Sequence, residues 1–555
     1  MEGKIEIDKK PIDITKSLDK AICRLRSEKD SVILWVDQIC INQQDQAEKE
    51  AQIKLMSLIY SRALNTVIWL GDTSAQDAFD AIHDLEINST SHYGPLLDER
   101  KKEISESREY KAIEDLFNSP WFQRTWTTQE ACLSNEPWVM AGASRCHWED
   151  CFGMAAVKER LGLFHPTPDQ TQELNSAKLT GDSTPSIRLH GFHCAIVIWE
   201  IRHASNRSLS LMEALVKTRH TQATQPHDNV YGILGLFEND IVPDYSTKAT
   251  ELWRNVSLKI LDGEIKYTER TLRNGVEPYH AFRFLSCIDH GVDESGELPS
   301  WAVDWLKSRV TTSLAYSTSV VGFLNTGRSS GVGCGLSIDQ TGKILSLRAK
   351  MFDDILALSP IFENANLDAA VSTADETALT NCIAYAKTTP GNCPVQFSFL
   401  GFCKVVTAGK DGSGRRKYPD DYTEILSFLC DAATGKSPTF RGQLYTRRQR
   451  GGWLKAADLK SPSMGVKYQG LQEAFKSALL NRRLCWTKKG HLGLVPRFAK
   501  QYDHVVVVPG SPVPFVVRPF VKRTYHIIGE CYTDGIMDGE ALKNQGQLLE
   551  DIGLV

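Results

Sequence analysis

The stretch SVILWVDQICINQQDQAEKEAQIKLMSLIYSRALNTVIWLGD, residues 31–72, decides the fold of the N-terminal part of this chain. Residues 33–39 and 66–70 are short apolar runs with the length and composition of buried strands. Between them, Asp45 and Glu48 have the spacing of a capping box, which predicts that a helix begins there. Two buried strands joined by a helix predict a right-handed crossover and a parallel sheet.

Polar side chains follow both predicted strands. Asp37, Asn42 and Gln43 come at the end of the first strand, and Asp72 follows the second. In open parallel sheets, ligands bind beyond the carboxyl ends of the strands, so this edge is a candidate binding site. For Asp37 and Asp72, hydrogen bonds to a ribose and capping of the next helix both stay open. For Asn42 and Gln43, bonds that order the loop are the favoured interpretation.

Composition and charge place the chain among soluble globular proteins. It has 555 residues, of which 42% are hydrophobic and 24% charged, and its length corresponds to about three or four domains. The net charge of -4 argues against binding to nucleic acid or membranes through overall basic charge, although local patches at residues 415–417 or 447–450 stay open. Residues 1–10 lack the apolar core of a secretory signal, and no apolar run has the roughly 20 residues that cross a bilayer. We expect a cytoplasmic protein.

The cysteine pattern and the missing nucleotide motifs argue against disulfides, a metal site and the common modes of nucleotide binding. The fourteen cysteines contain no C-x-x-C pair, so we expect reduced and mostly buried thiols. Cys146, His147 and Cys151 lie close together, but four ligands at suitable spacing are missing, and we predict no metal site. The chain has neither G-x-G-x-x-G nor a P-loop, which argues against the common dinucleotide and ATP motifs.

Four blocks of the N-terminal region carry a family resemblance. In order and spacing they resemble the heterokaryon incompatibility (HET) domain of filamentous fungi: LWVDQICINQ (34–43), QIKLMSLIYSRA (52–63), VIWLGD (67–72) and WFQRTWTTQEA (121–131). The resemblance implies a fold related to TIR domains and a role in nonself recognition and regulated cell death. It also implies protein partners, with self-association through the HET domain.

Later blocks extend the resemblance toward the C-terminus. One block matches at Asp228, Tyr231, Gly235, Leu236, Pro243, Asp244 and Tyr245, and others resemble HET proteins at residues 298–305 and in the turn-rich region 482–542, where several strands are expected. HET domains usually open with a strand that bears Ser-Tyr-x-Trp-Gly. This strand has no counterpart in the sequence, so we expect an N-terminally truncated HET domain with an exposed sheet edge.

The predicted architecture therefore has three parts. Residues 1–155 are expected to form the HET domain, an α/β unit of TIR-like type with a parallel sheet and flanking helices. Residues 156–270 are expected to form a helical connector, and residues 271–555 an α+β region typical of HET proteins.

The candidate catalytic residue is Glu130, on a helix predicted to begin at Ser119-Pro120. TIR-type NAD glycohydrolases use a glutamate at a comparable helix position, so the resemblance implies a catalytic Glu130 supported by Trp126, with NAD as substrate and no required cofactor. A carboxylate beside the ribose would stabilise an oxocarbenium-like transition state, and an indole would raise its pKa or stack on a ring. A structural, salt-bridged Glu130 stays open. Arg124 would bind phosphate or, as we favour, pair with a nearby acid.

Two functions from different classes follow. The first is incompatibility signalling through self-association, with NAD cleavage by the TIR-like domain as its enzymatic form. The second is a non-catalytic protein–protein interaction module that uses the same fold. A fragment without a stable fold is a third alternative. No binding of nucleic acid is expected under any of them.

Overall fold

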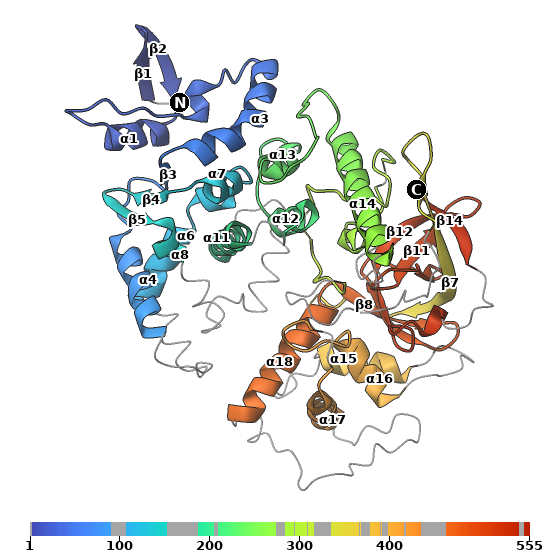
Figure 1. Ribbon diagram of the computed structural model, residues 1–555. Helices are drawn as coiled ribbons and strands as arrows, with labels where there is room; N and C mark the ends of the chain where they lie inside the picture. The colour runs from blue at the N-terminus through green and yellow to red at the C-terminus, as the bar shows by residue number, and fades with distance from the viewer. Residues whose placement is uncertain are drawn as a thin grey trace. The chain divides into compact units, whose positions relative to one another are not determined.

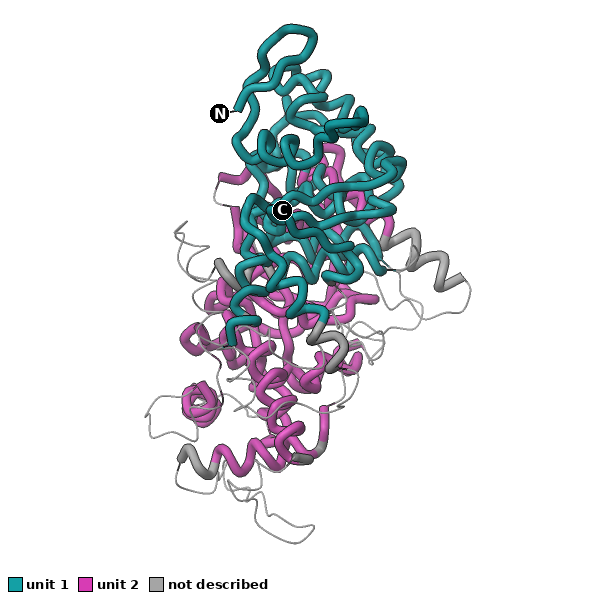
Figure 2. Tube along the Cα trace, turned by 90° about the vertical axis from the view of Figure 1, so that its left-hand side faces the viewer, with its two compact units in different colours: residues 1–252, 305–308 teal, residues 253–304, 309–555 magenta. Residues whose placement is uncertain are grey.

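The computed structural model describes residues 3–89, 107–152, 187–204, 209–273, 283–293, 295–307, 309–315, 335–363, 365, 367, 378–388, 390, 398–415, 418–434, 462–542 and 549–555. The chain forms two compact units (Figures 1 and 2). Unit 1 comprises residues 1–252 and 305–308, and unit 2 comprises residues 253–304 and 309–555.

Unit 1 contains a sheet with the strand order β3-β4-β5. Strand β3 (Thr66–Trp69) pairs in parallel with β4 (Pro137–Ala141), and β4 pairs antiparallel with β5 (Ser144–His147). One core cluster joins the sheet to helices that contribute apolar side chains, namely α4 (Gln76–Ser89), α6 (Arg108–Phe117), α8 (Trp148–Phe152) and α11 (Ile187–His203). The predicted α/β character of the N-terminal region is therefore present.

The N-terminal helices begin where their capping residues predict. A hairpin of β1 (Gly3–Ile7) and β2 (Lys10–Ile14) precedes α1 (Lys16–Leu25), which the side chain of Thr15 caps. Helix α3 (Gln46–Arg62) begins after Asp45, whose carboxylate accepts a hydrogen bond from the backbone N–H of Glu48 at 3.1 Å. Ile53 and Met56 of α3 are buried.

The buried strand predicted at residues 33–39 is wrong. Residues 31–36 form neither helix nor strand, Ile33 is 98% exposed, and α2 (Asp37–Cys40) is a short helix. Apolar composition alone does not make a strand, because the backbone also needs hydrogen bonds to a neighbouring chain. Strand β3 forms its parallel ladder with β4 instead, so the predicted crossover between residues 33–39 and 66–70 does not form.

The single helix predicted from Pro120 onward is also wrong, because the chain breaks in its middle. A 3₁₀ turn, η1 (Pro120–Gln123), ends before Arg124, and α7 (Thr127–Leu133) follows. At the break the backbone pairs with Gln222, which donates to Gln123 O at 2.6 Å and accepts from Thr125 N at 3.0 Å. Groups bonded to a distant segment cannot also form the ladder of a helix. Helices α12 (Leu211–Thr218) and α13 (Asp228–Leu234) flank this contact in the sequence.

Unit 2 is organised by the long strand β7 (Leu345–Leu358), which pairs with β14 (Glu550–Leu554), β10 (His504–Val507) and β8 (Arg482–Thr487) along its length. Because β11 (Phe515–Pro519) and β12 (Thr524–Glu530) connect β10 to β14, these strands close on β7 as a barrel. The remaining strands are β6 (Ser337–Ile338), β9 (Leu492–Pro496) and β13 (Tyr532–Thr533). The strands expected in region 482–542 are confirmed.

The helical elements of unit 2 include most of α14 (Ala249–Arg273) together with η2 (Phe284–Cys287), α15 (Ala378–Lys387), α16 (Phe399–Val406), α17 (Asp420–Thr434), α18 (Pro462–Leu479) and η5 (Glu540–Leu542). Within the described ranges, no helix is long and apolar enough to cross a bilayer. Those ranges also contain no group of three His, Cys, Asp or Glu residues placed to hold a metal ion.

Candidate functional site

Glu130 lies half-buried in the first turn of α7, beside an indole. The Nε1–H of Trp121 donates to Glu130 Oε2 at 3.2 Å. Trp121 is buried on η1 and makes edge contacts with Phe122 and Trp148, with ring centroids 5.2 and 6.0 Å apart. The break between η1 and α7 therefore places a fixed N–H donor against the carboxyl group.

The surroundings of Glu130 favour its protonated form. Burial raises the pKa of Glu130 from its usual 4.5 to about 7, although the Arg124 guanidinium opposes this shift. The negative charge of Asp37 raises the pKa further, and the hydrogen bond from Trp121 lowers it. At neutral pH both forms of the carboxyl group are populated, which is the condition in which a group can accept or release a proton readily.

Tyr60 of α3 belongs to the same electrostatic site. Its ring meets that of Trp35 edge-on, with centroids 5.7 Å apart. Burial raises the pKa of the Tyr60 phenol strongly, the charges of Glu130 and Asp37 add to this, and Arg124 opposes it. We call Asp37, Tyr60, Arg124 and Glu130 the carboxylate site. Tyr60 recurs at helical spacing with the buried Ile53 and Met56 of α3, a pattern that indicates an apolar face and gives no signal for a polar role.

The other predicted site residues lie elsewhere or act locally. Trp126 is half-buried just before α7, and its backbone carbonyl accepts from the N–H of Glu130; the indole that contacts the carboxyl group is that of Trp121. Asp72 forms an ion pair with Lys20. Asn42 accepts from Gln44 N through its side chain at 3.1 Å, as expected of a residue that orders its loop.

The downstream block at residues 228–245 packs onto α3. Tyr245 donates its hydroxyl to Asp228 Oδ1 at 2.5 Å, and its backbone N–H donates to Glu50 Oε1 at 2.9 Å. The Lys49 ammonium lies 4.3 Å from the centre of the Tyr245 ring. Nearby, Tyr231 donates its hydroxyl to a backbone carbonyl, that of Asp244, at 3.1 Å. The block is thus part of unit 1 and fixes the helix that carries Tyr60.

A second contact joins this block to the helix of Glu130. The Gln129 amide donates to the backbone carbonyl of Tyr231 at 3.0 Å, from α7 to α13. Thr125 and Thr221 share a hydroxyl hydrogen bond of 2.8 Å, and both side chains are buried. Residues far apart in the sequence therefore hold α7 in place, and with it the carboxylate site.

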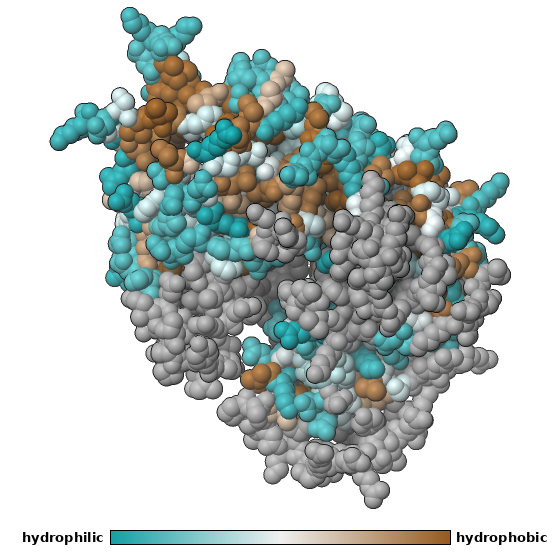
Figure 3. All heavy atoms as spheres, viewed as in Figure 1, coloured by the Kyte–Doolittle hydropathy of each residue, from teal (hydrophilic) through white to brown (hydrophobic). Residues whose placement is uncertain are grey.

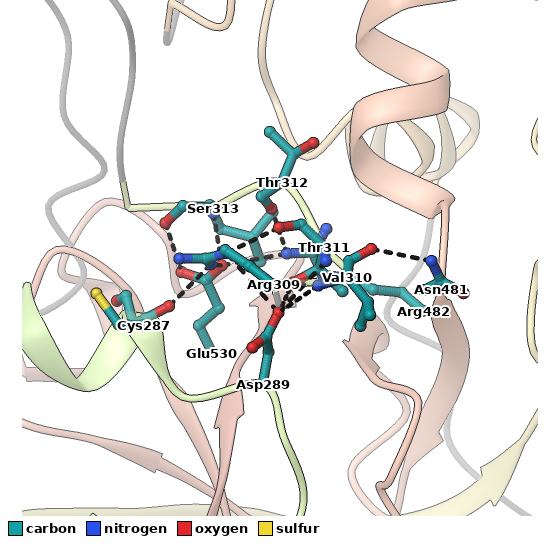
Figure 4. A network of polar contacts seen from close by, with 12 residues as sticks. Cys287, Asp289, Arg309, Val310, Thr311, Thr312, Ser313, Asn481, Arg482 and Glu530 are labelled. Atoms are coloured by element: carbon teal, nitrogen blue, oxygen red, sulfur yellow. Dashed lines mark hydrogen bonds and ion pairs between the residues drawn. The ribbon is translucent and has the colours of Figure 1, made fainter. Parts of the chain in front are cut away.

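Unit 2 has a separate polar centre around Glu530 (Figure 4). The Glu530 side chain is only 3% exposed. Its carboxylate accepts from the guanidinium of Arg309 at 2.9 Å, from that of Arg482 at 3.1 Å and from the backbone N–H of Leu314 at 2.7 Å. Asp289 accepts from Val310 N at 3.0 Å (Figure 4). These bonds attach residues 309–315 to the barrel, so we assign the cluster a structural role.

Lys410 adds a third cation to this centre. Its side chain is buried, and its ammonium donates to the backbone carbonyl of Ser313 at 2.8 Å. Burial lowers the pKa of Lys410 to about 8, while the charge of Glu530 opposes the shift. The ammonium thereby ties a further loop to the same segment that Glu530 holds.

Comparison with known proteins gives two family matches and one relative. The model of the family "Heterokaryon incompatibility protein (HET)" matches residues 1–130, and that of the "Het-6 beta-barrel domain" matches residues 455–549. The chain is 25% identical to "Heterokaryon incompatibility protein 6, OR allele" of Neurospora crassa over 601 residues, covering 96% of this chain and 85% of the relative. No solved structure matches. The first match ends at Glu130, and the second ends just before β14.

Proposed function

We propose that this chain, which is a heterokaryon incompatibility (HET) domain protein with a Het-6 β-barrel domain, acts in heterokaryon incompatibility. Two family matches and a relative aligned over most of the chain support this function. In this proposal the HET domain serves nonself recognition and promotes regulated cell death.

The enzymatic form of the proposal is NAD cleavage at the carboxylate site. The observation that supports it is the half-buried Glu130, whose carboxyl group accepts a hydrogen bond from the Trp121 N–H. The C–N bond between nicotinamide and ribose breaks, and its electron pair leaves with nicotinamide. Glu130, in its ionised form, stabilises the positive charge that develops on the ribose. Water then adds to the ribose and releases a proton, giving ADP-ribose. The exposed Arg124 guanidinium suits the pyrophosphate.

The state of Glu130 fits this role. A pKa of about 7 leaves a substantial ionised fraction at neutral pH. The cationic nicotinamide–ribose would favour ionisation of the carboxyl group on binding, because opposite charges in a poorly solvated site attract strongly. The TIR-related fold and the NAD substrate remain proposals that rest on the resemblance of the four N-terminal blocks.

Nicotinamide release from NAD by the purified full-length chain tests this form directly. The protein is assayed free and clustered on beads, beside Glu130→Gln and Glu109→Gln; Glu109 is an exposed glutamate of α6 and serves as the control. We expect turnover that Glu130→Gln lowers about 100-fold or more and Glu109→Gln leaves unchanged. If neither the free nor the clustered wild-type chain releases nicotinamide, NAD cleavage is refuted. If Glu130→Gln keeps full turnover, the site assignment is wrong.

Self-association without catalysis is the second candidate, and an apolar surface near the N-terminus favours it. Val32, Ile33 and Leu34 are exposed, as are Leu55 and Leu58 of α3, and the contact of Trp35 with Tyr60 holds the two segments together. Figure 3 shows hydrophobic residues gathered near the N-terminal hairpin. Exposed apolar patches of this kind mark protein–protein contacts.

Light scattering over a range of concentrations tests the second candidate. We expect the wild-type molar mass to rise with concentration and Ile33→Asp to remain monomeric. Val242→Asp, at an exposed valine of unit 1 outside this surface, is the matched control and should behave as wild type. A chain that stays monomeric throughout, or equal association of Ile33→Asp and wild type, would reject the surface.

A further inference from the structure

The hairpin of β11 and β12 ends in an exposed tip, residues 520–523, which is both apolar and basic. Phe520 and Val521 are 60% and 57% exposed, and Lys522 and Arg523, which follow, are exposed too. We propose that this tip is a docking site through which the barrel binds an anionic membrane surface. The inference is independent of NAD cleavage and concerns a part of unit 2 that has no place in the carboxylate site.

The backbone of the tip is strained at its two cations. Phe520 N donates to Thr524 O at 2.9 Å, and Thr524 N donates to Val521 O at 2.8 Å, which closes a two-residue turn. Lys522 and Arg523 occupy the turn with φ of 32° and 59°. Positive φ at both central positions favours Asn-Gly or Gly-Gly, because a Cβ is crowded there. Lys522 and Arg523 at these positions therefore lower the stability of the turn relative to Asn-Gly. Residues that are unfavourable for folding at strained positions indicate a functional role.

A second exposed segment lies at the same end of the sheet. Because His504 pairs with Val517, the chain before β10 and the chain after β11 leave the sheet together. The loop before β10 exposes Phe498 and, at 58%, Tyr502. Arg518 ties this loop to β11 by donating to the backbone carbonyl of Phe498 at 2.8 Å. This end of the barrel thus presents exposed apolar or aromatic side chains from two segments rather than one isolated ring.

Acidic groups at this end are mostly engaged. Asp503 pairs with Arg518 at 2.9 Å, and Asp354 pairs with Lys488 at 2.6 Å. On β14, which runs beside the tip, Asp551 lies 3.5 Å from Arg348. The charge of Glu550 raises the pKa of the Tyr525 phenol, so Glu550 counts as a negative charge at this end.

The cations that project at this end include Lys500, Lys522 and Arg523, all exposed. The local balance is therefore positive although the whole chain carries -4. This end therefore carries positive charge suited to an anionic surface, although the protein as a whole is net negative.

The chemistry of the tip fits a lipid surface better than a nucleic acid. Apolar side chains on a protruding turn can enter the headgroup region, while neighbouring cations meet anionic headgroups. Val521, which is as exposed as Phe520, has no flat face on which a base could stack. Phe520 is steadied by His526, with ring centroids 4.6 Å apart, so one aromatic anchor has a defined orientation.

Co-sedimentation of the full-length chain with phosphatidylcholine vesicles, with and without phosphatidylserine, tests the proposal. We expect binding that requires phosphatidylserine. Phe520→Ser combined with Val521→Ser should abolish it. Val466→Ser, at a similarly exposed valine of α18, should bind as wild type.

A second variant, Lys522→Asn with Arg523→Gly, separates binding from folding. It removes two charges, each worth about fivefold in partitioning to an anionic surface, so binding should fall about thirtyfold. It also supplies the Asn-Gly turn that this backbone favours, so the melting temperature should rise. Loss of binding in a more stable protein cannot come from unfolding.

The proposal is overturned if binding does not depend on phosphatidylserine, or if either tip variant binds vesicles as well as wild type. It is also overturned if the wild-type chain binds single-stranded RNA instead of vesicles and both tip variants lose that RNA binding.

Discussion

The indole of Trp121 donates to the carboxylate of Glu130 at 3.2 Å, across nine positions of sequence that include a break between two helical segments. The donor is fixed, because Trp121 packs edge-on against Trp148 in the core of unit 1. This pair defines the carboxylate site more sharply than any other contact, and two predictions rest on it.

Glu130 should make the stability of the protein depend on pH. Its pKa is raised from 4.5 to about 7 in the folded state, so between these values the folded protein holds more protons than the unfolded chain. The free energy of unfolding therefore falls as pH rises through this window. Glu130→Gln removes the effect, and its stability relative to wild type should increase from pH 4.5 to pH 8 by an amount on the order of 3 kcal/mol.

Urea unfolding of both proteins at several pH values measures this difference. The exposed control Glu109→Gln should show a constant difference from wild type. A difference for Glu130→Gln that is also constant with pH would mean that the carboxyl group titrates normally.

Trp121→Phe should raise the pKa of Glu130 further, because the indole hydrogen bond stabilises the ionised carboxylate. The midpoint of the pH-dependent stability should move upward relative to wild type. Trp126→Phe, which alters the tryptophan that the sequence favoured, should leave the midpoint in place. If Trp126→Phe moves the midpoint and Trp121→Phe does not, the assignment of the donor is wrong.

Glu530→Gln should destabilise unit 2 strongly. The substitution keeps the shape of the side chain but removes the carboxylate that pairs with the buried guanidinium groups of Arg482 and Arg309. Arg309 then keeps its longer contact with Asp289, at 3.9 Å. Breaking a buried ion pair in this way costs about 3–5 kcal/mol. Asp551→Asn breaks the exposed pair with Arg348 and should cost less than about 1 kcal/mol. Thermal unfolding of the two variants compares them, and equal losses would refute the role of the Glu530 cluster.

Gly191→Ala should destabilise unit 1 by about 1–3 kcal/mol. A Cβ at Gly191 of α11 would lie 1.9 Å from the backbone carbonyl oxygen of Phe117, so α11 and α6 would have to move apart. Gly263→Ala in α14 is the control, since a Cβ there meets nothing within 4 Å and favours the helix. Circular dichroism melts measure both variants. A melting temperature of Gly191→Ala equal to that of wild type would show that the contact is loose.

Some parts of the fold could be predicted because their signals are local. Thr15 and Asp45 mark helix starts, since a capping side chain bonds to an N–H three residues ahead. The strands of region 482–542 follow from short apolar runs between turn residues. The resemblance likewise directed attention to Glu130, which lies in a site with Asp37 and Arg124 as neighbours.

The sequence by itself determined where helices start, which segments alternate as strands and which carboxylate to examine. Only the tertiary structure decided that residues 31–36 are exposed, that Gln222 interrupts a helix at Arg124, and that Trp121 rather than Trp126 meets Glu130. The physical reason is the distance along the sequence over which each interaction acts. Caps and periodicity act within a few residues, whereas strand pairing, backbone hydrogen bonds to a distant segment and the partner of a buried indole depend on residues that folding brings together.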